Sequence, residues 1–179
     1  MAHKAVQAFF IRVVMQINKK LIATLGAVAA SIVVSTIPEL EGRELVPYKD
    51  IGGVSTYCAG ITNPPPIKGH TYTKEECVVI ESAVEAKHAE EFMACAPSNM
   101  TDGQKVAGVV FAYNVGTSAA CSSSFVRLLK QGKPKEACEA LLKWKYVTVK
   151  GKLIDCSIRN NNCYGVYARR LTERNFCLN

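Results

Sequence analysis

The sequence is poor in residues that bind metal ions. It has three histidines in 179 residues, and its eight cysteines include no Cys-x-x-Cys pair. None of the histidines lies near a cysteine pair at the spacing typical of zinc ligands. We therefore predict no metal site.

Acidic residues are absent from the first 20 positions, which hold four bases, Lys4, Arg12, Lys19 and Lys20. The remaining 159 residues hold 18 bases and 15 acids, so more than half of the net charge of +7 lies at the N-terminus. A nucleic-acid-binding protein needs a basic face on its folded part. This distribution therefore argues against nucleic acid as a partner.

Charge is also absent from residues 21–37, a run that Pro38 ends and that three glutamates follow. The run is at the short limit for crossing a bilayer core of about 30 Å, and small residues make it only weakly apolar. Bases before it and acids after it orient the N-terminus inward and the rest of the chain outward. We interpret it as a cleaved signal peptide, a permanent anchor or a weak anchor that later releases. A buried core helix is the less favoured alternative.

All three export interpretations place residues 38–179 outside the cytoplasm, where disulfides form. The number of cysteines is even, and none lies in the apolar run. A chain of this length can fold without disulfides, so the cysteines reflect the compartment. The predicted organisation is a targeting segment over residues 1–37 and one folded domain over residues 38–179.

The folded part is predicted to begin with a small β region and to continue with helices. Residues 47–62 combine glycines with β-forming residues, which predicts a hairpin or a three-stranded sheet. Capping boxes at 73–76 and 101–104 predict two helices, the first ending near Met93. The other expected elements are helices over 125–130, 134–144 and 166–176 and a polar, turn-like stretch over 146–163. The predicted class is α+β and mostly helical.

Two acids frame the step from a helical segment into the β region. Glu41 is expected at the end of the helix, and Asp50 in or beside the first β turn. A cleft there can hold one carboxyl protonated and another ionised, which glycoside hydrolysis requires. Taken alone, a Glu and an Asp at this spacing are more often two solvated surface acids.

The residues around the two acids follow a longer pattern, Glu-Gly, then Tyr-x-Asp-x-x-Gly-x-x-Thr. The matching positions are Glu41, Gly42, Tyr48, Asp50, Gly53 and Thr56. Further matches follow in order at 71–77, at Phe111, Asn114 and Gly116, and at Trp144, Arg169, Arg170, Glu173 and Arg174. This arrangement resembles the T4-type phage lysozymes, glycoside hydrolase family 24, and within them the signal-anchor-release endolysins of lambdoid phages. One departure is Ile61, where the family commonly has histidine.

The resemblance implies a lysozyme-like fold, with a small β-hairpin or sheet before a mostly helical lobe and a hydrophobic helix in front. It implies a muramidase that hydrolyses the β-1,4 bond between N-acetylmuramic acid and N-acetylglucosamine without a cofactor. Glu41 would be the general acid. Asp50 would activate water or stabilise the oxocarbenium-like charge, and Thr56 would position that water.

The resemblance also implies that residues 1–37 are a signal-anchor-release segment. The enzyme would be held inactive in the host inner membrane, facing the periplasm, and then released as a monomer to act on peptidoglycan. Two other functions fit the same fold: a non-catalytic peptidoglycan-binding or structural protein, and a lytic transglycosylase.

The cysteines can be compared with the same family. Lambdoid endolysins also carry cysteine at the positions of Cys58, Cys77, Cys138 and Cys177. We expect Cys156 to pair locally with Cys163. Cys95 and Cys121 are then expected to pair with each other.

Overall fold

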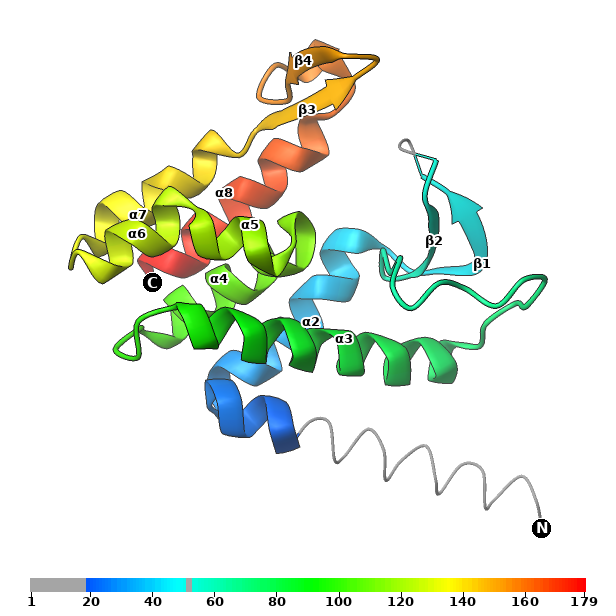
Figure 1. The fold of residues 1–179 in the computed structure, drawn as a ribbon, viewed down its shortest axis with the longest axis horizontal. Coiled ribbons are helices and arrows are strands. Elements are labelled where there is room, and N and C mark those ends of the chain that lie inside the picture. Colours follow the sequence, from blue (N-terminus) through cyan, green and yellow to red (C-terminus); the bar gives the residue numbers. More distant parts are fainter. Residues whose placement is uncertain (1–18, 51–52) are drawn as a thin grey trace. The chain divides into compact units, whose positions relative to one another are not determined.

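The computed structural model describes residues 19–50 and 53–179 (Figure 1). The chain divides into two compact units, Met1–Lys87 and His88–Asn179. Helices and two small antiparallel sheets make up the described residues. This mixed and mostly helical class is the one that the sequence predicts.

The first unit begins with a broken helix. Lys19–Leu25 is helical, Gly26 interrupts it with a φ of 89°, and α2 (Ala27–Glu41) follows at a bend of 117°. The predicted apolar run therefore forms two helical pieces. In the described part of the chain, no single helix is long and apolar enough to cross a membrane, whereas the bent pair together meets those criteria. The first 18 residues of the predicted targeting segment lie outside the described residues.

Pro38, which ends the apolar run in the sequence, lies inside α2, and the helix ends at Glu41 as predicted. Proline lacks a backbone donor but keeps its carbonyl. The Pro38 carbonyl accepts the Gly42 N–H at 3.1 Å. The helix thus continues past the proline and places Glu41 at its last position.

The first sheet is a two-stranded hairpin. Strand β1 (Glu44–Lys49) pairs antiparallel with β2 (Ser55–Cys58), and Tyr48 lies opposite Thr56. Residues 51 and 52 of the connection lie outside the described part. The structure thus selects the hairpin from the two predicted alternatives. The next element is α3 (Lys74–Cys95), which begins at the predicted capping box.

The second unit is mainly helical. Its elements after α3 are α4 (Asp102–Val115), α5 (Thr117–Ser122), α6 (Ser124–Lys130), α7 (Pro134–Ala140), β3 (Tyr146–Val149), β4 (Lys152–Asp155) and α8 (Tyr164–Leu178), with 3-10 turns at Leu141–Lys143 and Arg159–Asn161. Helix α8 packs along α4 (Figure 1). In the core, the Phe92 ring lies so close to Gly108 that a Cβ there would be 2.2 Å from it.

One prediction for the second unit is wrong. Residues 146–163 are not merely turn-like, because they contain the β3–β4 hairpin and a 3-10 turn. Lys150 and Gly151 both have positive φ, of 49° and 75°, as a two-residue hairpin turn requires. The alternating Tyr-Val-Thr-Val of β3 was the available signal. The helix predicted over 134–144 also ends earlier, at Ala140, and continues as the 3-10 turn.

All eight cysteines form disulfides. The pairs are Cys58–Cys77, Cys95–Cys121, Cys138–Cys177 and Cys156–Cys163. The two pairings predicted from the sequence are confirmed. The four family-matched cysteines pair with one another, and Cys58–Cys77 joins β2 to α3.

Candidate active site

Two glycines shape the helix end where Glu41 lies: one follows it in the sequence and the other lies against its side chain. Glu41 is the last residue of α2, and Gly42 after it has a φ of 74°, which lets the chain turn toward β1. The Glu41 carboxyl lies against the backbone of Gly60. A Cβ at Gly60 would be only 3.2 Å from Glu41 Oε2. Gly60 therefore leaves the space that this carboxyl occupies.

Asp50 and Thr56 are both held by Val54. The Val54 N–H donates to Asp50 Oδ1 at 2.8 Å, and the Thr56 hydroxyl donates to the Val54 carbonyl at 3.2 Å. Thr56 is buried, at 4% exposed. Both side chains thus bond to the backbone of the same residue in the hairpin turn.

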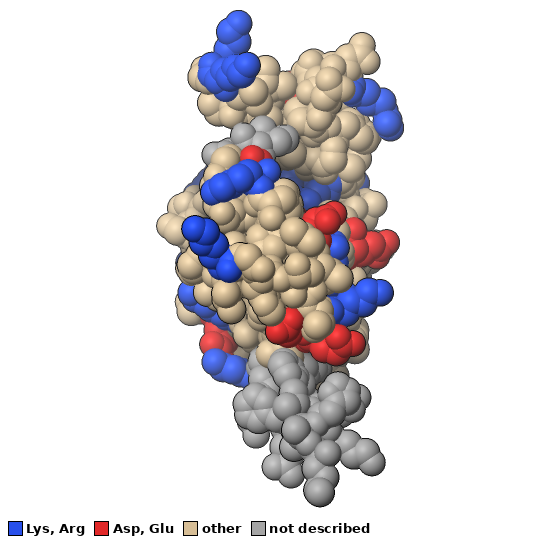
Figure 2. All heavy atoms as spheres, turned by 90° about the vertical axis from the view of Figure 1, so that its right-hand side faces the viewer, with Lys and Arg blue, Asp and Glu red and all other residues tan. Residues whose placement is uncertain are grey.

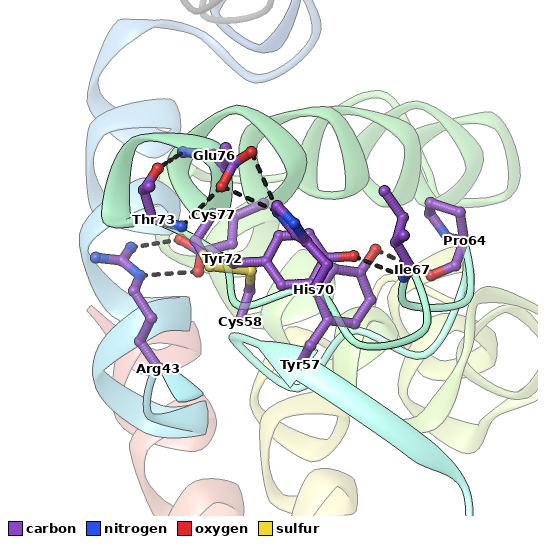
Figure 3. The surroundings of a disulfide bond; sticks show 11 residues. Arg43, Tyr57, Cys58, Pro64, Ile67, His70, Tyr72, Thr73, Glu76 and Cys77 are labelled. Carbon is purple, nitrogen blue, oxygen red and sulfur yellow. Dashed lines mark hydrogen bonds and ion pairs between the residues drawn. A yellow bond between two sulfur atoms is a disulfide. The ribbon is translucent and has the colours of Figure 1, made fainter. Parts of the chain in front are cut away.

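An ion pair holds the chain just after Glu41. Arg43 Nε donates to Glu81 Oε1 at 2.9 Å, and a second guanidinium N–H donates to Glu81 Oε2. Glu81 lies on α3 and is almost fully buried. Figure 3 shows the Arg43 side chain reaching α3 beside the Cys58–Cys77 disulfide. A two-bond contact of this kind fixes orientation as well as position.

A second carboxyl is buried one helical turn along from Glu81. Glu85 is 1% exposed, and its Oε2 has no hydrogen-bond partner in the described part of the structure. Burial raises the pKa of Glu85 to about 8, and the negative charge of Glu81 adds to this, while Arg43 opposes it. Glu85 is therefore mostly protonated at neutral pH.

A small core behind the hairpin ties β2 to the start of α3. The Tyr57 and Tyr72 rings lie 4.6 Å apart, between their centroids, and pack with the disulfide (Figure 3). The Tyr57 hydroxyl donates to the Pro64 carbonyl at 3.0 Å, and the Tyr72 hydroxyl accepts the Ile67 N–H at 2.9 Å. Because Tyr57 follows Thr56 directly, this core fixes the strand that carries Thr56.

Ile61, the departure from the family pattern, belongs to the same core. It pairs with Tyr57 through a β-bridge and is 3% exposed. An apolar side chain therefore suits this position.

In the described residues, one cluster of side chains carries atoms of the types that bind metal ions. Cys58, Cys77 and Glu81 offer ligand atoms within 4.8 Å of one another. The two sulfurs are bonded to each other, so they supply no thiolate. The group therefore forms part of the scaffold beside the helix end.

The three predicted catalytic residues all lie in the first unit, on a helix end, in a turn and on a strand. The sequence did not reveal Arg43, Glu81, Glu85 or Gly60 as part of the surroundings. Arg43 lies two residues after Glu41, but its partner Glu81 is 38 residues away. From the sequence, Gly60 could be interpreted only as a turn residue.

Residues 38–173 match the sequence model of the family described as phage lysozyme. The chain belongs to the phage lysozyme family. The matched range contains the helix end, both hairpins and most of α8.

Two curated relatives are SAR-endolysins. The one from Escherichia phage 933W is 35% identical over 156 residues, which cover 83% of this chain and 84% of the relative. The one from Enterobacteria phage PA-2 is 34% identical over 160 residues, covering 86% and 88%. Among solved structures, an endolysin from Escherichia coli O157:H7 phage FAHEc1 superposes with a TM-score of 0.72 at 27% identity, covering 82% of this chain and 90% of that one.

The contact between Gly60 and Glu41 predicts a specific loss of activity. Gly60→Ala places a methyl group against the Glu41 carboxyl, so we expect lysis of outer-membrane-stripped cells to fall about 10- to 100-fold through misplacement of Glu41. Gly69→Ala is the matched control, since Gly69 has a similar φ of 75° with nothing within 4 Å of the added Cβ. Both variants should lose about 1 kcal/mol of stability. Equal activity in the two variants would contradict the contact.

The buried Glu85 predicts a pH-dependent stability. Below pH 4.5 the carboxyl is protonated in both the folded and the unfolded chain and has no effect. Between pH 4.5 and about 8 only the unfolded chain ionises, so the free energy of unfolding falls as pH rises. Glu85→Gln should therefore gain about 3 kcal/mol over wild type at pH 7 and little at pH 4.

Urea unfolding at several pH values measures this difference. Glu75→Gln, an exposed position on the same helix, is the matched control. A gain from Glu85→Gln that is the same at pH 4 and pH 8 would refute the role of burial.

Proposed function

We propose that this protein hydrolyses the β-1,4 bond between N-acetylmuramic acid and N-acetylglucosamine in bacterial peptidoglycan. The chain is a phage endolysin of the lysozyme family, and its relatives imply peptidoglycan as the substrate class. The proposal concerns the bond, the residues and the control of the activity.

One observation carries the assignment of residues. Asp50 and Thr56 are both bonded to Val54 in the turn of the first hairpin, and Glu41 ends the helix that leads into that hairpin. The three residues thus lie on neighbouring elements of the chain, all within the residues that match the family model. Their surroundings differ, since the Glu41 carboxyl faces the Gly60 backbone whereas Asp50 accepts a backbone N–H.

In the proposed reaction Glu41 gives its proton to the glycosidic oxygen as the bond to the sugar carbon breaks. Asp50 removes a proton from a water molecule that attacks the opposite face of that carbon, and Thr56 orients the water. This route inverts the configuration and requires a separation of about 6.5–9.5 Å between the carboxyl groups. Glu41 and Asp50 finish with their protonation states exchanged.

The same helix supports a mechanism of control. The apolar residues Leu25, Val33 and Ile37 are buried by protein atoms in this structure, each at most 1% exposed. In the bilayer these side chains would contact lipid instead, and α2 would not take its place in the fold. Because Glu41 lies four residues after Ile37, the anchored enzyme would lack a positioned general acid. Release from the host inner membrane into the periplasm would allow the site to form, and the enzyme would act as a monomer.

Substitution of the two carboxyls tests the residue roles. Glu41→Gln and Asp50→Asn should each lower muramidase activity about 10²- to 10⁴-fold, because each removes a proton-transfer step. Glu39→Gln is the control, an exposed residue two positions earlier on the same helix. Wild-type products should carry reducing muramic ends. Anhydro ends would instead identify a lytic transglycosylase, and full activity of Glu41→Gln would favour a non-catalytic role for this position.

A more apolar segment tests the control mechanism. Leucine at the exposed positions Ala23, Ala27, Ser31 and Ser35 strengthens membrane retention without changing the buried face. We expect lysis by cells expressing this variant to fall about tenfold or more, because each added leucine favours the bilayer. After detergent extraction the same protein should regain wild-type activity on isolated sacculi. Full activity in intact, energised membranes would contradict the mechanism.

A further inference from the structure

The excess of basic over acidic residues in the folded part lies in one segment. Residues 141–163 hold five bases and one acid, whereas residues 21–140 and 164–179 together hold 13 bases and 14 acids. The bases of this segment are Lys143, Lys145, Lys150, Lys152 and Arg159, and the acid is Asp155. In Figure 2 the top of the view, where Figure 1 places the β3–β4 hairpin, shows blue and tan spheres without red.

Large apolar side chains are exposed in the same segment. Leu153 is 68% exposed and Ile158 is 53% exposed, and Tyr146 and Val149 are also exposed. Val149 lies opposite Lys152 in the hairpin register, and Thr148 lies opposite Leu153. Aliphatic and basic residues are therefore neighbours at the hairpin tip. By the register, Tyr146 and Leu153 share one face of the hairpin and Val149 and Lys152 share the other, so apolar side chains are exposed on both faces.

The hairpin is held rigid from its base. An isolated two-stranded hairpin is marginally stable in water. Here Lys145 forms an ion pair with Asp155 at 2.8 Å and donates to the Ser157 hydroxyl at 3.1 Å. The Cys156–Cys163 disulfide closes the following turn, and the Arg159 guanidinium lies 4.0 Å from the centre of the Tyr164 ring. These contacts hold the base of the hairpin and the turn that follows it.

We propose that the β3–β4 hairpin docks the folded body on an anionic phospholipid surface. The charge is complementary, since each Lys or Arg near such a surface strengthens binding about fivefold. The apolar residues are mostly aliphatic, as suits insertion among lipid headgroups and acyl chains. A sugar-binding surface would instead expose several aromatic rings for stacking. After release of the N-terminal segment, this contact would keep the enzyme at the membrane, a role that rests on the proposed function.

A fluorescent probe in the hairpin tests the contact in the full chain. Leu153→Trp adds a reporter at an exposed site, with Trp144 as constant background. The protein is added to brominated phosphatidylcholine vesicles, either alone or with about one third phosphatidylglycerol. The N-terminal segment can bind both kinds of vesicle, so we expect the extra quenching of the new tryptophan only with the anionic lipid.

Charge reversal supplies the matched comparison. In the probe background, Lys150→Glu with Lys152→Glu should lower the apparent affinity of the quenched state about 25-fold or more, about fivefold for each lysine removed. Lys130→Glu with Lys135→Glu changes the net charge equally at exposed sites outside the hairpin and should have a much smaller effect. Thermal unfolding and lysis of isolated sacculi should be unchanged in the hairpin variant.

The proposal is overturned by equal quenching in both kinds of vesicle, by equal losses in the two charge-reversal variants, or by no loss in the hairpin variant. A hairpin variant that binds sacculi poorly but contacts vesicles normally would show a glycan subsite instead, which also overturns it. Because quenching does not require catalysis, a failure of this proposal is distinct from a failure of the muramidase assignment.

Discussion

The ion pair between Arg43 and Glu81 is the constraint on which the candidate site depends. It fixes the chain two residues after Glu41 to a buried position on α3, through two hydrogen bonds in the fork geometry of the guanidinium. The Cys58–Cys77 disulfide attaches β2 to the same helix. Helix α3 therefore holds both the end of α2 and the strand that carries Thr56.

This arrangement places two carboxyl groups, those of Glu81 and Glu85, out of water. Burying carboxyl groups is costly unless they are paired or protonated. Glu81 is paired with Arg43, whereas the pKa of Glu85 is raised to about 8 by burial and by the neighbouring charge of Glu81. Because Glu85 is mostly protonated at neutral pH, the two neighbouring glutamates are not both negatively charged. The cluster thus fixes the end of α2, and the free energy of unfolding falls at higher pH.

The two hairpins of the chain have different surroundings and different proposed tasks. The β1–β2 hairpin has Glu44 at the start of its first strand, and it holds Asp50, just after that strand, and Thr56 through Val54. The β3–β4 hairpin carries the excess positive charge of the folded part and exposes aliphatic side chains. The acidic residues proposed for catalysis and the basic residues proposed to bind an anionic surface therefore lie in different parts of the chain.

The sequence by itself determined the features that depend on neighbouring residues. The capping boxes that begin α3 and α4 were predicted because each is a bond between residues three apart. The order of Glu41, Asp50 and Thr56 identified the family, and the local Cys156–Cys163 pair was foreseen. The β3–β4 hairpin was missed, since its turn residues, Lys150 and Gly151, give a weak signal. Only the tertiary structure decided that Arg43 pairs with Glu81, that Glu41 lies against Gly60 and that Glu85 is buried. The two contacts join residues 38 and 19 positions apart, and the burial depends on how the helices and strands pack.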